Sequence, residues 1–151
     1  MQAIAIEHEM LVKNLRTAFD HESNAHLRYV EFAEKADGEG WHGIASLFRA
    51  VSCAEQIHAA NHARILHQLG GHAEYTPQAI EVNATFENLR TALAGEIFEA
   101  DTMYPAFAEL ARAARGKTVC HNLHGVNPIS TLRDHLQRPV LAFYGIEVAS
   151  A

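Results

Sequence analysis

A length of 151 residues suits a single domain, because a chain of about 150 residues buries roughly 70% of its unfolded surface in one core. Twelve basic against 18 acidic residues give a net charge of -6, which excludes a groove that neutralises nucleic-acid phosphates. Two cysteines without a CxxC pair, Cys53 and Cys120, exclude a disulfide framework and a thiolate metal knuckle, and they favour a reducing compartment.

The N-terminal segment reaches its first charged residue at Glu7, which is too early for the apolar core of a signal peptide. No later segment approaches about 18 consecutive apolar residues, the length that a membrane span needs. We therefore expect a cytoplasmic protein with no membrane segment.

Residues 11–36 predict an amphipathic helix, because inward positions recur at alternating steps of four and three. This stripe consists of Leu11, Leu15, Ala18, Glu22, Ala25, Tyr29, Phe32 and Ala36. A break at residues 37–40 ends the helix, and the same rhythm predicts a second helix that stops at Gly70. The second stripe consists of Ile44, Phe48, Val51, Glu55, His58, His62, Ile65 and Leu69. Both stripes therefore place glutamates on a face that should be buried.

Residues 71–83 contain glycine and proline breaks and predict a long crossover between two helical hairpins. A third helix follows, with the inward set Phe86, Leu89, Leu93, Glu96, Met103, Phe107 and Leu110, and with Glu99 one turn beyond Glu96. A short fourth helix is expected from about residue 128, where Asn127 and Pro128 offer a start and Pro139 a kink.

An internal repeat relates the two halves of the chain. Residues 14–19 (NLRTAF) recur as residues 88–93 (NLRTAL), and each copy has a glutamate eight residues after its asparagine, at Glu22 and Glu96. The repeat predicts two duplicated hairpins and hence an all-α four-helix bundle with pseudo-twofold symmetry.

The glutamates on the inward stripes need an explanation, because a buried carboxylate costs several kcal/mol unless it is paired or binds a metal. Glu55 and His58 stand three residues apart, so a carboxylate and an imidazole lie side by side on one helix face. Carboxylate-rich sites with a minority of imidazole suit iron or manganese, and iron in a redox role is the favoured assignment. The predicted metal ligands are Glu22, Glu55, His58, Glu96 and Glu99.

Less specific interpretations apply to the other polar residues. His62 is expected to be a hydrogen-bonded core residue, and Tyr29 and Tyr104 are expected to be either donors to the ligands or core aromatics. The remaining histidines have no ligand spacing and are expected at the surface: His21, His26, His42, His67 and His72.

The chain resembles the rubrerythrin family over residues 10–112. The motifs that carry this resemblance are Glu55-Gln56-Ile57-His58, Gly95-Glu96 followed by Glu99, and Met103-Tyr104-Pro105. The resemblance implies a ferritin-like bundle and a di-iron site that reduces hydrogen peroxide with electrons from a rubredoxin-like or flavin-linked donor. Manganese or zinc are alternatives as the loaded metal.

The resemblance also implies individual roles. Glu22 would be a terminal ligand of one iron, Glu55 a bridge, and Glu96 a terminal ligand of the other iron. One iron would move between Glu99 and His58 as its redox state changes, which makes these two the expected catalytic residues.

The sequence departs from the family pattern in two ways. It has no rubredoxin-like tail with paired CxxC motifs, so an external electron donor is expected. The duplication also predicts a second ExxH at residues 129–132, where no ligand stands, and the chain from residue 113 is atypical. Three explanations remain open: a site completed by another chain's helix, a mononuclear remnant, or an altered reading of the gene's end. Asp134 and His135 lie nearby as substitute ligands if the fourth helix shifts register.

The sequence thus predicts a single-domain di-iron peroxidase. The alternatives are a ferritin-like iron-binding or ferroxidase protein and a structural relic that folds without metal. A homodimer, with helix exchange as one form of it, is expected because the fourth helix is weak.

Overall fold

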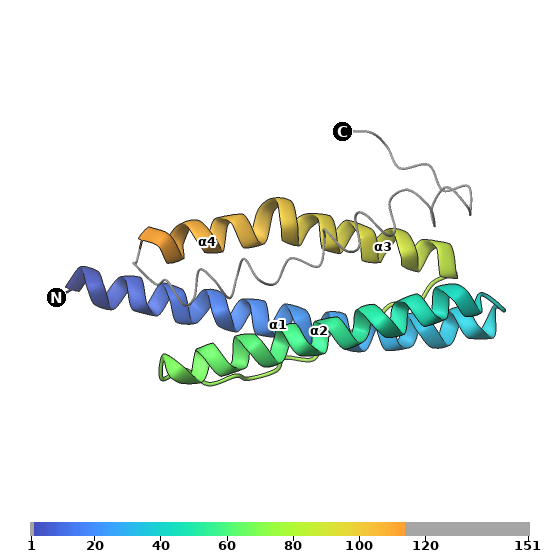
Figure 1. Ribbon diagram of the computed structural model, residues 1–151, viewed down its shortest axis with the longest axis horizontal. Helices are drawn as coiled ribbons and strands as arrows, with labels where there is room; N and C mark the ends of the chain where they lie inside the picture. Colours follow the sequence, from blue (N-terminus) through green and yellow to red (C-terminus); the bar gives the residue numbers. More distant parts are fainter. Residues whose placement is uncertain (1, 114–151) are drawn as a thin grey trace.

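The computed structural model describes residues 2–113, and these residues form an all-α structure (Figure 1). Helices α1 (Gln2–Gly38) and α2 (His42–Gln68) form a long antiparallel hairpin. Helix α3 (Thr85–Phe98), the π-helical segment η1 (Glu99–Met103) and α4 (Tyr104–Ala113) continue one another as a third rod along this hairpin. The expected fourth helix near residue 128 lies outside the described residues, as do Pro139, Asp134 and His135.

The hairpin has the boundaries that its sequence predicts, and it is longer at its N-terminal end. Gly40 takes a φ of 82° in the turn between α1 and α2, and Gly70 takes a φ of 78° just after α2. Left-handed backbone of this kind favours glycine, because a Cβ would crowd the neighbouring carbonyl. Residues 69–84 form no helix or strand and return along the bundle to the start of α3, as the predicted crossover requires.

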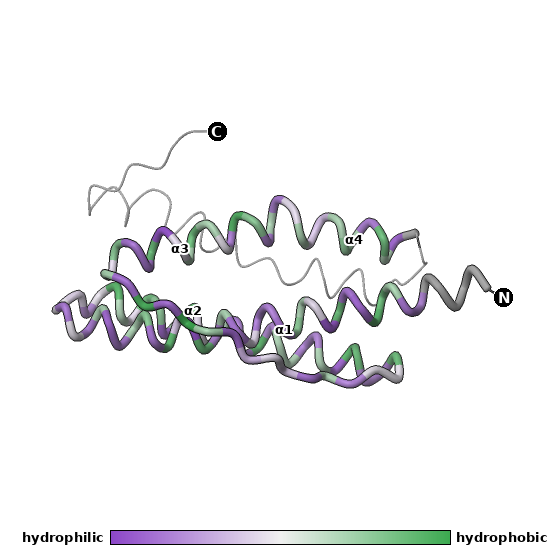
Figure 2. The backbone as a smooth tube through the Cα atoms, turned by 180° about the vertical axis from the view of Figure 1, so that it is seen from behind, coloured by the Kyte–Doolittle hydropathy of each residue, from purple (hydrophilic) through white to green (hydrophobic). Residues whose placement is uncertain are grey.

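The predicted stripe of α1 is confirmed, since all eight of its positions are buried. The stripe of α2 is buried as well, with His58 and Leu69 only partly covered. Hydrophobic and hydrophilic residues alternate along each helix in Figure 2, as amphipathic helices require. No helix among residues 2–113 is both long and apolar enough to cross a membrane.

The third rod differs from its prediction after Glu99. Met103 is buried as predicted, but Leu110 is 37% exposed, Phe107 is only partly buried, and Ala108 and Ala111 are buried instead. A π-helical turn accommodates one extra residue, so it moves the inward face by one position in everything that follows. The predicted inward position of Leu110 is therefore wrong, whereas Phe107 is partly buried and still packs against the core. The most buried face of α4 is shifted by one residue.

The core consists of two apolar clusters at different levels of the bundle. One contains Leu11, Leu15, Ala18, Ile65, Leu66, Met103, Tyr104 and Ala111. The other contains Ala25, Tyr29, Phe32, Ala33, Ala36, Ile44, Ala45, Phe48, Val51 and Leu89. Along α1, Glu22 lies between the residues that contribute to one cluster and those that contribute to the other. The core is therefore divided by a polar layer.

Candidate metal centre

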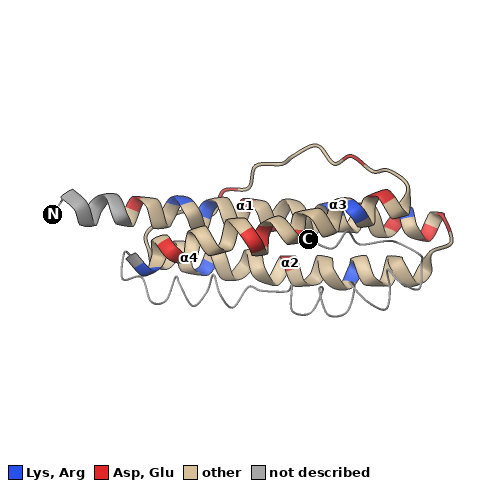
Figure 3. Ribbon diagram, turned by 90° about the horizontal axis from the view of Figure 1, so that it is seen from above, with Lys and Arg blue, Asp and Glu red and all other residues tan. Residues whose placement is uncertain are grey.

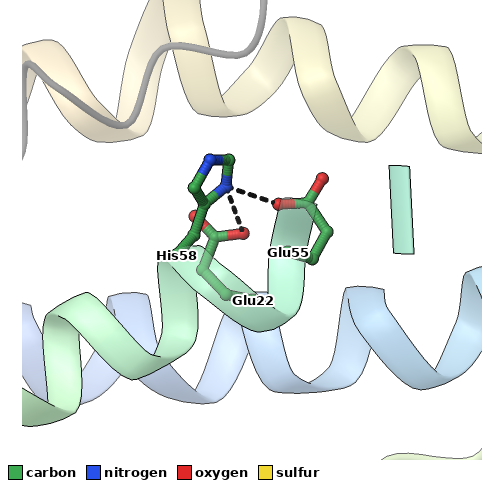
Figure 4. A group of neighbouring side chains, drawn as sticks. All are labelled: Glu22, Glu55 and His58. Carbon is green, nitrogen blue, oxygen red and sulfur yellow. Dashed lines mark hydrogen bonds and ion pairs between the residues drawn. The ribbon is translucent and has the colours of Figure 1, made fainter. Parts of the chain in front are cut away.

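The polar layer contains a compact group of three side chains. Glu22 comes from α1, and Glu55 and His58 come from successive turns of α2 (Figure 4). One ligand atom of each residue lies within 4.8 Å of the other two. His58 Nδ1 is 2.8 Å from Glu55 Oε2 and 3.9 Å from Glu22 Oε2. Three of the five predicted ligands are thus brought together around a space that suits one metal ion.

The other two predicted ligands enter from the third rod. Glu96 lies in the last turn of α3 and Glu99 begins η1, and both are buried, with relative exposures of 2% and 3%. Both glutamates point inward because residues three apart lie on the same face of a helix. In the part of the chain that the structure describes, neither carboxylate joins the 4.8 Å group of Glu22, Glu55 and His58.

Each carboxylate of the third rod instead contacts a partner on α1. Tyr29 donates a hydrogen bond of 2.9 Å from its hydroxyl to Glu96 Oε1. His21 Nδ1 lies 2.9 Å from Glu99 Oε1, which is ion-pair distance. The surface prediction for His21 is therefore wrong, because this residue is half-buried at the edge of the candidate centre. His21 directly precedes Glu22, but no spacing rule distinguishes such a neighbour from a surface residue.

Tyr104 and His62 form a second layer behind Glu22. The Tyr104 hydroxyl donates to Glu22 Oε1, and His62 Nε2 lies 3.1 Å from the same hydroxyl oxygen. Because the single hydroxyl proton of Tyr104 points to Glu22, its oxygen accepts the Nε2 hydrogen of His62. His62 is fully buried and hydrogen-bonded, as predicted. Tyr29 and Tyr104 combine both expected roles, since each belongs to an apolar cluster and donates to a glutamate.

Four of the other histidines with predictions, at positions 26, 42, 67 and 72, do not belong to the ligand group. His42, His67 and His72 are exposed, as predicted. His26 is half-buried, because its Nδ1 bonds to the backbone oxygen of Ser52 at 2.9 Å, so its surface prediction is wrong.

Four buried glutamates determine the pKa values in the polar layer: Glu22, Glu55, Glu96 and Glu99. Burial opposes the ionised form of Glu22, but nearby His58 and His62 hold the pKa of its carboxyl below the usual range. Burial raises the pKa of Glu55, Glu96 and Glu99, and neighbouring carboxylates raise it further. Burial also raises the pKa of Tyr29 and Tyr104, so both remain protonated donors at neutral pH.

These residues fit a carboxylate-bound metal centre. Three buried carboxylate oxygens, Glu22 Oε2, Glu55 Oε1 and Glu96 Oε2, have no hydrogen-bond partner among the described residues, and neither has His21 Nδ1. A buried oxygen that lacks a hydrogen bond costs about 1–3 kcal/mol, and more when it is charged. A divalent cation would satisfy these oxygens and neutralise their mutual repulsion, and oxygen donors with one imidazole suit iron or manganese.

Comparison with known proteins supports this reading. A family model described as Rubrerythrin matches residues 13–123. Rubrerythrin-2 of Clostridium acetobutylicum is 31% identical over 127 residues, which cover 80% of this chain and 66% of the relative. Rubrerythrin of Porphyromonas gingivalis is 43% identical over 102 residues, which cover 66% of this chain and 50% of the relative. The chain spans about half to two thirds of the length of these relatives.

The fold is similar to that of a solved structure, the fully reduced, all-ferrous state of nigerythrin. The two share 28% identity with a TM-score of 0.79, over 93% of this chain and 69% of that one. This similarity confirms the predicted ferritin-like helical bundle. In Figure 3, the Lys and Arg residues of the described helices are interspersed with Asp and Glu.

Proposed function

The chain belongs to the rubrerythrin family, and we propose that its buried polar layer is a di-iron centre that reduces hydrogen peroxide with electrons from an external donor. The observation that carries this proposal is the group of Glu22, Glu55 and His58 with unsatisfied oxygens in a dry core. Glu96 and Glu99, buried on the facing rod, would supply the ligands of a second ion.

Two ferrous ions, when bound, would supply both electrons that cleavage of one O–O bond needs. The overall conversion takes one hydrogen peroxide, two electrons and two protons to two waters. A rubredoxin-like or flavin-linked protein is the proposed donor class.

The side chains of the layer have distinct tasks in this proposal. Glu22, Glu55 and His58 would hold one ion, and Glu55 would also contribute to the second. Tyr104 orients Glu22 through its hydroxyl, and Tyr29 orients Glu96 in the same way. The apolar clusters on both sides exclude bulk water, which strengthens these polar contacts.

Metal content and reoxidation kinetics test the proposal together. Glu55→Ala should lower bound iron sharply, whereas Gln56→Ala, at an exposed neighbouring position on α2, should leave it unchanged. The reduced wild-type protein should hold two irons and be reoxidised by hydrogen peroxide faster than by dioxygen. Unchanged iron content in Glu55→Ala and Glu22→Ala would contradict this assignment of the site.

The alternative function is iron binding or ferrous oxidation without peroxide turnover. It predicts reoxidation that is faster with dioxygen than with peroxide, and release of ferric iron afterwards. One iron per chain with one-electron products would also refute the peroxidase while leaving the fold intact.

A further inference from the structure

The contact between His21 and Glu99 gives this centre a feature that the five ligands alone do not. His21 lies on α1 directly before Glu22, and its Nδ1 is 2.9 Å from Glu99 Oε1 on η1. The Glu99 side chain is only 4% exposed, whereas the His21 side chain is 31% exposed. His21 therefore joins a buried carboxylate to the outer edge of the polar layer.

Glu99 is one of two predicted ligands that lie outside the close group of ligand atoms in the described part of the chain. Glu22, Glu55 and His58 meet within 4.8 Å, but the Glu99 carboxylate lies outside this group, against His21. A carboxylate oxygen binds a transition metal at about 2.0–2.2 Å. Glu22, Glu55 and His58 form the one group of three or more ligand atoms that converges among residues 2–113, so Glu99 and its neighbours do not yet form a site for a second ion. Glu99 must therefore move its carboxylate away from His21 to help complete such a site.

We propose that His21 is a positioning residue that holds the Glu99 carboxylate away from the metal group, so that binding of a second ion requires Glu99 to leave His21. This inference rests on the di-iron proposal and adds a residue outside the predicted ligand set. His21 then competes with the second ion for one carboxylate. The first ion, held by Glu22, Glu55 and His58, does not face this competition.

Removal of the competitor should tighten only the second binding step. When only a fraction of the protein is in the binding-competent state, the apparent affinity for the ligand falls by that fraction. A mutation that releases Glu99 should raise this fraction. We expect His21→Ala to lower the dissociation constant of the second ion about twofold to fivefold, the size of a partly exposed ion pair. His21→Gln keeps an N–H donor and should retain part of the competition.

The experiment is an anaerobic titration of the metal-free full chain with cobalt(II), followed by its visible absorption, which reports how many ions are bound and how each is coordinated. His26→Ala is the matched control, because His26 is another half-buried histidine of α1 that bonds to Ser52 and to none of the glutamates. The result that supports the inference is a tighter second step in His21→Ala, an intermediate one in His21→Gln, and no change in His26→Ala.

The outcomes separate this inference from the proposed function. A wild-type chain that binds no cobalt, iron or manganese overturns the di-iron proposal itself. A wild-type chain with two binding steps, whose second step is unchanged or weaker in His21→Ala, overturns only the role of His21, and a weaker step would make His21 a ligand. If the wild type binds a single ion, gain of a second ion in His21→Ala upholds the inference and its failure to appear overturns it.

A double-mutant cycle on the metal-free protein provides a readout that does not depend on metal. His21→Ala and Glu99→Gln should have non-additive effects on the free energy of unfolding, because each removes the same contact. Additive effects would show that His21 does not hold Glu99.

Discussion

Replacement of Glu96 by glutamine should raise the free energy of unfolding of the metal-free protein at alkaline pH. With metal present, the variant should be less stable than the wild type. Glu96 is 2% exposed at the end of α3, and its Oε1 accepts the hydroxyl hydrogen of Tyr29. Glutamine has nearly the same shape and can accept the same hydrogen bond through its amide oxygen. The substitution therefore removes the ionisation of this side chain with little change in packing.

The magnitude follows from the pKa of Glu96, which burial and the nearby charge of Glu99 raise from 4.5 to about 7. Because the folded state binds the proton more tightly than the unfolded state, stability falls as the pH rises from about 4.5 through about 7. At 1.36 kcal/mol per pKa unit, the loss is about 1 kcal/mol at pH 5 and about 3 kcal/mol at pH 8. Glu96→Gln should avoid this loss.

Urea unfolding of chelator-treated protein at pH 5 and pH 8 measures the effect. Part of the pH dependence should remain in Glu96→Gln, because the folded state also raises the pKa of Glu55 and of His21. The stability that each of these groups contributes in its protonated form is likewise lost as the pH rises. The matched control is Glu34→Gln, an exposed glutamate of α1, which should keep the wild-type pH dependence.

With added ferrous iron, the wild type should become more stable than Glu96→Gln. A metal at one hundred times its dissociation constant stabilises the wild type by about 2.7 kcal/mol, whereas the neutral amide of Glu96→Gln binds the ion poorly. A wild-type stability that stays level or rises between pH 5 and pH 8 without metal would refute this reasoning. A Glu96→Gln variant with the full wild-type pH dependence would refute it too.

Three further predictions concern stability and assembly. Tyr104→Phe leaves Glu22 Oε1 without its hydroxyl donor and should lower the free energy of unfolding by about 1–3 kcal/mol in urea titrations, whereas an unchanged midpoint would contradict the contact. Phe32→Ala leaves a cavity at a fully buried site in an apolar cluster and should lower the free energy of unfolding by about 3–5 kcal/mol in the same titrations. A loss below about 1 kcal/mol would show that this cluster is loosely packed. The homodimer remains a prediction, which light scattering at working concentration tests, and a monomeric mass would remove it.

The helical stripes of α1 and α2 could be predicted from sequence because one period of 3.6 residues runs through each of them without interruption. Eight of eight stripe positions in α1 are buried, including Glu22. The third rod could not be predicted to the same degree. Its period changes at Glu99, where the backbone inserts a π-helical turn, and no residue of the segment marks that insertion as glycine or proline marks a helix end. Ala111 and Leu110 exchange burial as a result.

The candidate ligands could be predicted because a glutamate in an apolar stripe is costly and therefore informative. Their partners could not, since the contact of His21 with Glu99 joins α1 to η1 across the bundle. Tyr29 and Tyr104 were recognisable only as inward aromatics, because the direction of a hydroxyl depends on which helix faces it. Sequence periodicity identifies the face of a helix, whereas the partner of each side chain depends on the tertiary packing.

The partners on α1 have a consequence for how folding and metal binding are linked. Four carboxylates that repel one another would weaken a metal-free core, yet the contacts of Tyr29 with Glu96 and of His21 with Glu99 hold two of them in defined positions. Helix α1 thus gives the third rod a polar interface that does not require metal. The contact of His21 with Glu99 must break when a second ion binds, whereas Tyr29 uses only Glu96 Oε1 and leaves Glu96 Oε2 without a hydrogen-bond partner. Metal affinity in this chain therefore depends on the strength of those α1 contacts as well as on the ligands, and a stronger metal-free fold should come with weaker binding of the second ion.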